Sequence, residues 1–268
     1  MTVPAGADIF RLDGTVAIVT GASGWLGTAM TAVLAEAGAH VVAIARDKAR
    51  LDAVVEPLRT AGHSVEALPC DISTPDWPAA VRRIAAERGR LDVLVNNAHV
   101  GRGGSLRLAS AEYYREALEL GIIAASEGIN AARDGFTASL AAGGKPSVVN
   151  VSSMYGLVSP DPGLYDSEEG RNPPFYGVIK AGLLQLTRYA AAELGPQGIR
   201  VNALTPGPFP QHPEKMDPAF VDRLASRTVL KRFGTPDDIR APLLFLASPW
   251  SGFVTGANLV VDGGWTIT

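Results

Sequence analysis

A tyrosine, a lysine and a serine in the second half of the chain have the types and spacing for acid–base chemistry on a substrate oxygen. Tyr176 and Lys180 stand four residues apart in an apolar stretch without a helix breaker before Gly195, so they share one face of a predicted helix. A free phenol titrates near ~10, and an ammonium group beside it favours the phenolate and lowers its pKa. The hydroxyl of Ser153, 23 residues before Tyr176, could hold the substrate oxygen while the phenol passes a proton. Such a pair also occurs by chance on many helices, so the rest of the sequence is needed to show whether this one is catalytic.

The composition favours a soluble protein and argues against several functions. Of the 268 residues 47% are hydrophobic and 19% are charged, which is ordinary for a protein with a sizeable core. The net charge of −3 argues against a nucleic-acid surface. Cys70 is the one cysteine, and residues 1–10 lack the basic start and apolar run of a signal peptide. We expect a cytoplasmic protein with no nucleic-acid or membrane partner.

Short apolar runs alternate with helical segments along the whole chain. Strands are expected at 16–20, 40–45, 64–69, 91–95, 147–151, 199–203 and 258–261. Helices are expected at 28–37, 47–61, about 77–88, 111 to about 140, from 176 onward, and 237–247. This alternation predicts an α/β fold, a doubly wound parallel sheet of about seven strands with helices on both faces. No linker divides the chain, so residues 1–268 are predicted to form a single Rossmann-type domain with residues 1–11 as an N-terminal arm.

Two proline-rich loops, at 157–174 and 207–227, are candidates for the substrate site. In a doubly wound sheet the ligand lies beyond the carboxyl ends of the strands, where both loops would also lie. Long loops in compact domains often cover active sites. The alternative is that both are plain surface excursions.

The turn after the first predicted strand, Thr20-Gly-Ala-Ser-Gly-Trp-Leu-Gly27, is typical of a dinucleotide site. Glycines there let the backbone approach a pyrophosphate at the N-terminus of the following helix. The alternative is a tight turn without a ligand. The predicted cofactor contacts in this turn are Gly21, Ser23, Gly24, Trp25, Leu26 and Gly27.

The end of the second strand indicates which nicotinamide cofactor is bound. Sites for NAD carry an acid there, whereas the 2′-phosphate of NADP is matched by arginine. Ala45 stands at the expected acid position and Arg46 follows it, which favours NADP(H) over NAD(H). Asp47 directly follows Arg46 and argues in part for NAD(H), because it is an acid near the expected position, although it could instead cap the next helix.

Taken in order, the motifs resemble the short-chain dehydrogenase/reductase family, in its classical subclass, from about Phe10 to the end. The set consists of the glycine turn, Cys70-Asp-Ile72, Asn96-Asn-Ala98, Asn150-Val-Ser-Ser153, Tyr176 to Lys180, Arg200-Val-Asn-Ala-Leu-Thr-Pro-Gly207 and Val254 to Gly264. The resemblance implies catalytic roles for Ser153, Tyr176 and Lys180. It also implies cofactor contacts by Asp71, Ile72, Asn96, Ala98, Tyr176, Lys180, Pro206 and Gly207, and a homotetramer or dimer with the Tyr176 helix in an interface. Ser152 is expected to pack, and Tyr165 is excluded because Glu169 stands where its lysine would be.

Four positions depart from the family pattern. Trp25 replaces a glycine of the turn, which gives a spacing similar to that of the extended, epimerase-like subclass. The family's catalytic asparagine is missing near Glu119. His99 replaces a glycine, and it could face the substrate or be a structural histidine. The segment between Ser153 and Tyr176 is about ten residues longer than the family usually has, so the insert is expected to build part of the substrate pocket.

These observations predict an oxidoreductase that uses NADP(H), or less favourably NAD(H), to interconvert a secondary alcohol and a ketone. The expected substrate is a small molecule of the polyol, sugar-acid or 3-oxoacyl type. His99, Arg171 and His212 favour a hydroxylated one. No metal site is expected. The alternatives are a catalytically silent cofactor-binding sensor or assembly protein, and a sugar-nucleotide epimerase-like member of the family.

Overall fold

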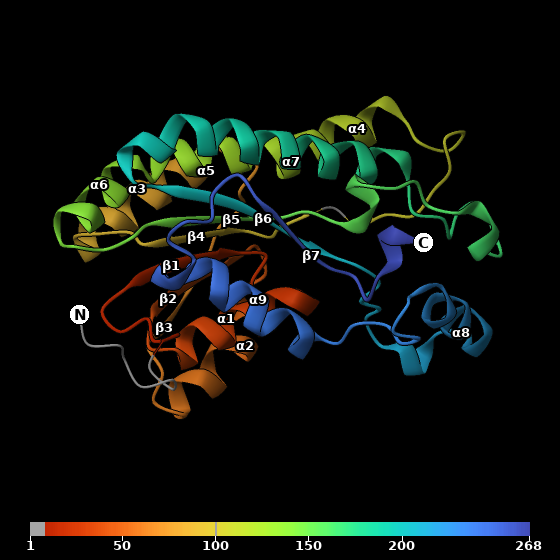
Figure 1. Cartoon of the computed structure of the whole chain (residues 1–268), viewed down its shortest axis with the longest axis horizontal. Coiled ribbons are helices and arrows are strands. Elements are labelled where there is room, and N and C mark those ends of the chain that lie inside the picture. Colours follow the sequence, from red (N-terminus) through yellow and green to blue (C-terminus); the bar gives the residue numbers. More distant parts are fainter. Residues whose placement is uncertain (1–8, 100) are drawn as a thin grey trace.

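The computed structural model describes residues 9–99 and 101–268, which form one seven-stranded parallel sheet between two layers of helices (Figure 1). In space the strands follow the order β3-β2-β1-β4-β5-β6-β7, and every neighbouring pair is parallel. The strands are β1 (Val16–Thr20), β2 (His40–Ala45), β3 (Val65–Pro69), β4 (Val93–Asn96), β5 (Ser147–Val151), β6 (Arg200–Pro206) and β7 (Asn258–Val261). The predicted doubly wound fold is confirmed. Of the predicted arm, residues 1–8 lie outside the described residues, and the arm ends at the buried side chain of Leu12.

Helices cover both faces of the sheet. One face carries α1 (Trp25–Glu36), α2 (Lys48–Thr60) and α9 (Pro236–Ala247) (Figure 1). The other face carries α3 (Asp76–Arg88), α4 (Ala111–Leu118), α5 (Ala124–Ala131), α6 (Arg133–Ala141) and α7 (Pro174–Leu194). The remaining helix, α8 (Pro218–Arg227), lies outside these two layers, on the side of the molecule where the chain ends.

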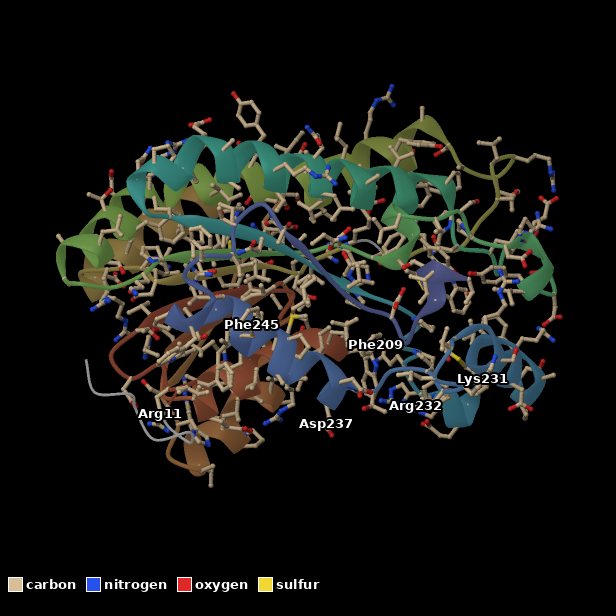
Figure 2. The ribbon with its side chains drawn as sticks, viewed as in Figure 1. Arg11, Phe209, Lys231, Arg232, Asp237 and Phe245 are labelled. Atoms are coloured by element: carbon tan, nitrogen blue, oxygen red, sulfur yellow. The ribbon has the colours of Figure 1, made fainter. Side chains whose placement is uncertain are left out.

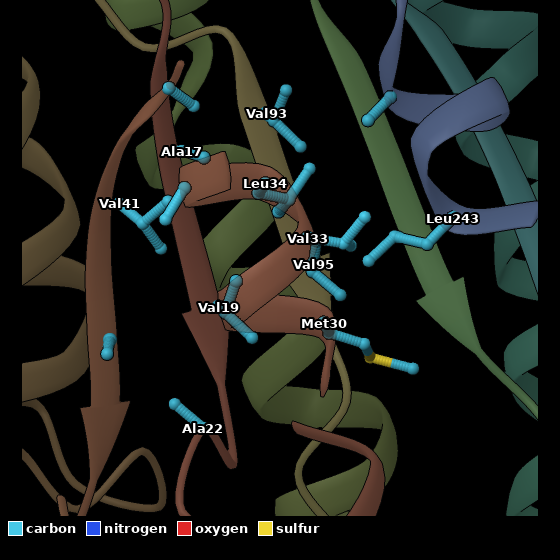
Figure 3. Packing of buried hydrophobic residues seen from close by; sticks show 14 of the residues in the cluster. Ala17, Val19, Ala22, Met30, Val33, Leu34, Val41, Val93, Val95 and Leu243 are labelled. Carbon is cyan, nitrogen blue, oxygen red and sulfur yellow. The ribbon is translucent and has the colours of Figure 1, made fainter. Parts of the chain in front are cut away.

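The core follows the two-residue period of the strands. Ala17 and Val19 of β1 pack in the layer of α1 and α9, whereas Val16 and Ile18 pack in the layer of α3, α5 and α7. Figure 3 shows the first of these layers, with Leu34 of α1 beside the β1 side chains. Burial of each large aliphatic side chain contributes roughly 1.5–3 kcal/mol, so both faces of the sheet are held by their helices.

The long helical stretch predicted from 111 to about 140 is divided into several helices. The segment contains α4, a π-helical turn η1 (Glu119–Ile123), α5 and α6. The turn packs closely on α7, because a Cβ atom on Gly121 would stand 2.2 Å from Cγ2 of Ile179. Hydrophobic periodicity cannot predict this local widening, since it depends on a neighbouring helix.

The ends of the two central strands are joined through Thr20. Its buried hydroxyl donates to the Val95 carbonyl at 3.2 Å and accepts from the backbone amides of Asn97 and Ala98 at 3.0 and 3.2 Å. The Asn97 side-chain amide donates back to the Thr20 carbonyl at 3.0 Å. These bonds hold the turns after β1 and β4 against each other, and both turns border the candidate site.

Replacing Thr20 with valine tests this link. Thr20→Val keeps the shape of the side chain but leaves one buried and one half-buried backbone amide without an acceptor, so the free energy of unfolding should fall by about 2 kcal/mol. Urea denaturation followed by circular dichroism measures the change. Thr60→Val removes an exposed helical hydroxyl and should change the stability little. Equal stabilities for the two variants would contradict the assigned role.

Candidate active site

A cleft of about 470 Å³ runs along the carboxyl ends of the strands. Residues directly after β1, β2, β3, β4, β5 and β6 all contribute to its wall, including Gly21, Arg46, Cys70, Asn97 and Ser152. This is the place where doubly wound sheets bind their ligands. Every predicted catalytic and cofactor-binding residue except Asn96 lines this cleft.

The glycine turn is packed so tightly that only glycine fits at two positions. Gly21 has a φ of +64°, and a Cβ atom there would lie 2.9 Å from Cα of Ala98. A Cβ atom on Gly27 would lie 2.0 Å from the Gly21 carbonyl oxygen. Gly24 occupies the N-cap of α1 and brings no side chain to the helix end. The positive end of the helix dipole is therefore open to an anionic ligand.

Trp25 begins α1 and connects the turn to the loop at 207–227. Its indole ring lies 5.9 Å from the imidazole of His212, measured between ring centroids. The indole Nε1 is buried and has no hydrogen-bond partner among the described residues. Since a buried indole N–H usually finds an acceptor, this donor beside the turn suits a polar ligand group.

Two arginines border the cleft after β2. Arg46 is exposed there, and its positive charge helps the Ser73 backbone amide to hold the pKa of Asp71 below its usual range. Asp47 caps α2 by accepting from the Arg50 amide at 3.1 Å, as one of the two interpretations had it. The sequence analysis missed Arg50, whose guanidinium donates to the Ser23 carbonyl at 3.2 Å. Its position in the first turn of the capped helix was the available signal.

The tyrosine, lysine and serine come together at the other end of the cleft. Tyr176 and Lys180 lie on one face of α7, with the lysine Nζ 5.6 Å from the centroid of the phenol ring. The Ser153 hydroxyl, directly after β5, lies within hydrogen-bonding reach of the Tyr176 phenol and favours its ionised form. Lys180 is buried, and its Nζ donates to the Val151 carbonyl at 2.6 Å. Ser152 packs, as expected, and donates to the Lys180 carbonyl at 2.9 Å.

Burial controls the titration of this group. It lowers the pKa of Lys180 to about 8, because the ammonium ion loses its hydration. It also raises the pKa of Tyr176, and the hydrogen bond from Ser153 opposes that rise. The lowered phenol pKa that the sequence suggested is therefore not found in this structure, since desolvation outweighs the stabilisation of the phenolate.

His99 lies beside Tyr176. The two rings meet edge to face, with centroids 6.0 Å apart and planes at 70°. His99 is an exposed residue whose imidazole borders the cleft, and the neighbouring protein atoms desolvate the ring in part. Their desolvation and the charge of Lys180 lower the pKa of His99 to about 4, so this histidine is neutral at pH 7. The structure thus places it among the site residues.

The two long loops pack against each other beside the tyrosine. Arg223 of α8 donates to the Leu164 carbonyl at 3.1 Å and pairs with Asp166, and Arg227 pairs with Asp161. Apolar side chains from both loops and the C-terminus lie beneath these pairs: Leu164, Tyr165, Phe220, Leu224 and Trp265. Tyr165 bonds the Tyr155 hydroxyl at 3.0 Å and is not paired with a lysine.

Known proteins resemble the chain over nearly its whole length. A family model described as enoyl-(acyl carrier protein) reductase matches residues 21–266. The chain belongs to the short-chain dehydrogenase/reductase family. Galactitol 2-dehydrogenase (L-tagatose-forming) of Cereibacter sphaeroides is 32% identical, over 97% of this chain and 98% of that protein. The 3-oxoacyl-[acyl-carrier-protein] reductase of Thermotoga maritima is also 32% identical, over 96% of this chain and 100% of that protein.

A solved structure shows the same fold and carries a cofactor. Gluconate 5-dehydrogenase from Burkholderia cenocepacia, in complex with NADP and tartrate, superimposes with a TM-score of 0.85. It is 28% identical, and the match covers 98% of this chain and 100% of that one. As a member of the short-chain dehydrogenase/reductase family, the chain is an oxidoreductase of that type.

One predicted family contact does not line the cleft. Asn96 points into the sheet, where its side-chain amide donates to Asn150 Oδ1 at 2.8 Å, and the cleft is lined by Asn97 instead. The alternation of side chains along a strand separates these neighbours, and β4 continues through Asn96. Leu120, in the π-helical turn near the missing asparagine, also lines the cleft, as do Phe209 and Gln211. Figure 2 shows Phe209 between α9 and α8.

Two of the three polar residues expected to favour a hydroxylated substrate lie outside the lining of the cleft. Arg171 does not line the cleft. It lies near Glu168 in the insert, and its carbonyl accepts from the Gly104 amide at 2.9 Å. His212 is connected to the site through its ring contact with Trp25.

Over residues 9–99 and 101–268, no three histidine, cysteine or acidic side chains gather as metal ligands. In the same residues, no helix has the length and apolar character needed to cross a membrane.

The cost of burying Lys180 leads to a stability prediction. Because its pKa in the folded protein, about 8, lies below the ordinary lysine pKa of 10.5, the unfolded chain keeps the proton to higher pH. The cost is full below about pH 8 and shrinks as the pH rises toward 10.5. Lys180→Met should therefore raise the free energy of unfolding at pH 7 by about 2 kcal/mol after the lost hydrogen bond is counted.

Thermal unfolding at pH 7 and at pH 10 measures this effect, and the gain should be smaller at pH 10. Lys145→Met removes an exposed lysine and serves as the matched control. A less stable Lys180→Met protein at pH 7 would show that the ammonium group is a net stabilising element.

Proposed function

We propose that the chain is an NADP(H)-dependent oxidoreductase that interconverts a secondary alcohol and a ketone. The observation that carries this proposal is the meeting of Ser153, Tyr176 and Lys180 at one end of a cleft whose other end holds Arg46 and Arg50. Relatives acting on galactitol, on gluconate and on 3-oxoacyl groups support a polyol, a sugar acid or a 3-oxoacyl compound as substrate.

The cofactor would lie along the cleft. Gly21 and Gly27 leave room for backbone contact with the pyrophosphate, and the N-terminus of α1 supplies its positive dipole. Arg46 and Arg50 would hold the 2′-phosphate. The contacts proposed from Ser23, Gly24, Trp25, Leu26, Asp71, Ile72, Ala98, Pro206 and Gly207 all come from residues that line the cleft. Bound nicotinamide supplies the hydride in one direction and accepts it in the other.

The side chains of this protein would transfer the proton that accompanies the hydride. In the reductive direction the Tyr176 hydroxyl donates its proton to the substrate oxygen, while the Ser153 hydroxyl donates a hydrogen bond to the same oxygen. The Lys180 ammonium stabilises the phenolate that remains. This role matters because burial alone raises the pKa of Tyr176 and would hold the phenol neutral.

We also propose that the protein is one domain and assembles as a homotetramer or dimer in the cytoplasm. Val178 and Tyr189 on α7 are 58% and 68% exposed, and they supply the apolar surface that an interface through the Tyr176 helix needs.

The catalytic role of the phenol predicts a selective loss in turnover. Tyr176→Phe should lower kcat for ketone reduction by about 10³-fold, because it removes the hydroxyl assigned as the proton donor, while the NADPH dissociation constant stays within about twofold. Tyr189→Phe, on the exposed face of the same helix, is the matched control and should behave as the unchanged protein. A Tyr176→Phe enzyme with unchanged kcat would show that Tyr176 is not the proton donor.

The cofactor assignment is tested by quenching of tryptophan emission, because Trp25 lies at the turn. NADPH should bind at least about tenfold more tightly than NADH, since a charge-assisted contact to the 2′-phosphate is worth roughly 1.5–3 kcal/mol. Arg46→Ala should weaken NADPH binding about tenfold and leave NADH unchanged. Arg188→Ala, an exposed arginine on α7, is the control.

Three other outcomes would redirect the proposal. Binding of NADH more tightly than NADPH would contradict the assignment of Arg46 to the 2′-phosphate, whereas the assignment of the chain as an enzyme would stand. Cofactor binding without reduction of any ketone would favour a catalytically silent sensor or assembly protein, which the missing asparagine near Glu119 supports. A nucleotide sugar bound to the purified protein would favour the epimerase-like alternative.

A further inference from the structure

One histidine in the cleft has no part in the proton transfer described above. His99 follows β4, borders the cleft together with Ser153 and Tyr176, and has its ring edge to face with the phenol at 6.0 Å. It is therefore within reach of atoms adjacent to any oxygen that the tyrosine and the serine hold. Elsewhere at this end, Leu120, Pro206 and Phe209 give an apolar lining and Gln211 a polar one.

The hydrogen bonding of His99 defines what the ring can offer to a ligand. The backbone of Asn97 favours a proton on the ring nitrogen that lies near it. The surrounding protein atoms and the positive charge of Lys180 disfavour a second proton, so the other ring nitrogen keeps its lone pair at pH 7. No described residue donates a hydrogen bond to that nitrogen. It is an available acceptor beside the reacting centre.

We propose that His99 accepts a hydrogen bond from a second hydroxyl group of the substrate, on the carbon next to the one that reacts. This inference rests on the proposed function, which places the reacting oxygen at Ser153 and Tyr176. The substrate class is then a vicinal diol in the oxidative direction and an α-hydroxyketone in the reductive direction. Discrimination follows because a site built to bond a hydroxyl group binds the analogue without it poorly.

An adjacent carbonyl or ether oxygen would not fit this position. Both groups carry lone pairs only, and they would face the lone pair of the ring nitrogen. A hydroxyl group has the donor that the nitrogen lacks. Simple ketones remain substrates, with water in place of the missing hydroxyl, and bind more weakly.

The test measures binding without turnover. The enzyme is saturated with NADPH, which cannot oxidise an alcohol, and the dissociation constants of butane-2,3-diol and butan-2-ol are measured by ligand-observed NMR. The diol should bind about tenfold more tightly to the unchanged protein. His99→Phe keeps a ring against Tyr176 and removes the acceptor, so the ratio should fall to about one. His99→Gln offers an amide oxygen and should keep part of the preference.

His63→Phe is the matched control. His63 lies between α2 and β3, does not line the cleft, and should leave the ratio unchanged. Equal binding of the two alcohols by the unchanged protein, or a full diol preference in His99→Phe, would overturn the proposal. A tenfold weaker NADPH dissociation constant in His99→Phe with an unaltered alcohol ratio would assign the histidine to the cofactor and also overturn it.

Turnover separates this inference from the proposed function. The same proteins are assayed with NADPH for reduction of 3-hydroxybutan-2-one and butan-2-one. A diol preference that depends on His99, without reduction of either ketone, would support the hydroxyl site and reject the oxidoreductase mechanism. Reduction of both ketones with equal efficiency in the unchanged protein and in His99→Phe would keep the mechanism and reject the hydroxyl site.

Discussion

The backbone contact between the turns after β1 and β4 is the constraint on which the site depends. A Cβ atom on Gly21 would stand 2.9 Å from Cα of Ala98, so these turns touch with no side chain between them. Thr20 and Asn97 bond across the same contact. Changes in the turn are tolerated only at positions that point away from this contact. Trp25 is such a position, because it opens α1 and its ring lies toward His212.

A second close contact fixes the reacting groups. A Cβ atom on Gly177 would lie 2.8 Å from the Tyr155 carbonyl oxygen, and one on Gly156 would lie 2.8 Å from the backbone of Lys180. The 3-10 turn η2 (Met154–Gly156) is therefore pressed against the first turns of α7. Ser153 and Tyr176 are placed by this contact and not by the chain between them. This explains how the long insert can be accommodated without moving the serine away from the phenol.

Much of this arrangement could be predicted from the residues. Strand-helix alternation predicts the sheet, and the ordered motifs place Ser153, Tyr176 and Arg46 at one edge of it. What the sequence could not show depends on contacts between distant segments. The π-helical turn at Glu119–Ile123 is set by packing against α7, and Arg50 enters the cleft only because Asp47 caps α2. The sequence analysis predicted a lowered pKa for the Tyr176 phenol, whereas burial raises it in the folded protein. Burial is a property of the folded chain and could not be read from the spacing of Tyr176 and Lys180.

The loop at 207–227 borders the cleft through Gly207, Phe209 and Gln211, whereas no residue of the insert at 157–174 lines it, and the insert packs against that loop instead. Exposed ion pairs such as Arg227–Asp161 each contribute little, roughly 0–1 kcal/mol, because water competes for both partners. The buried contacts of Leu164, Leu224 and Trp265 contribute more, since they remove apolar surface from water. The two loops are thus held together mainly by an apolar cluster beside Tyr176. A change in the insert can therefore alter the cleft only indirectly, through the apolar cluster that holds it to the loop at 207–227.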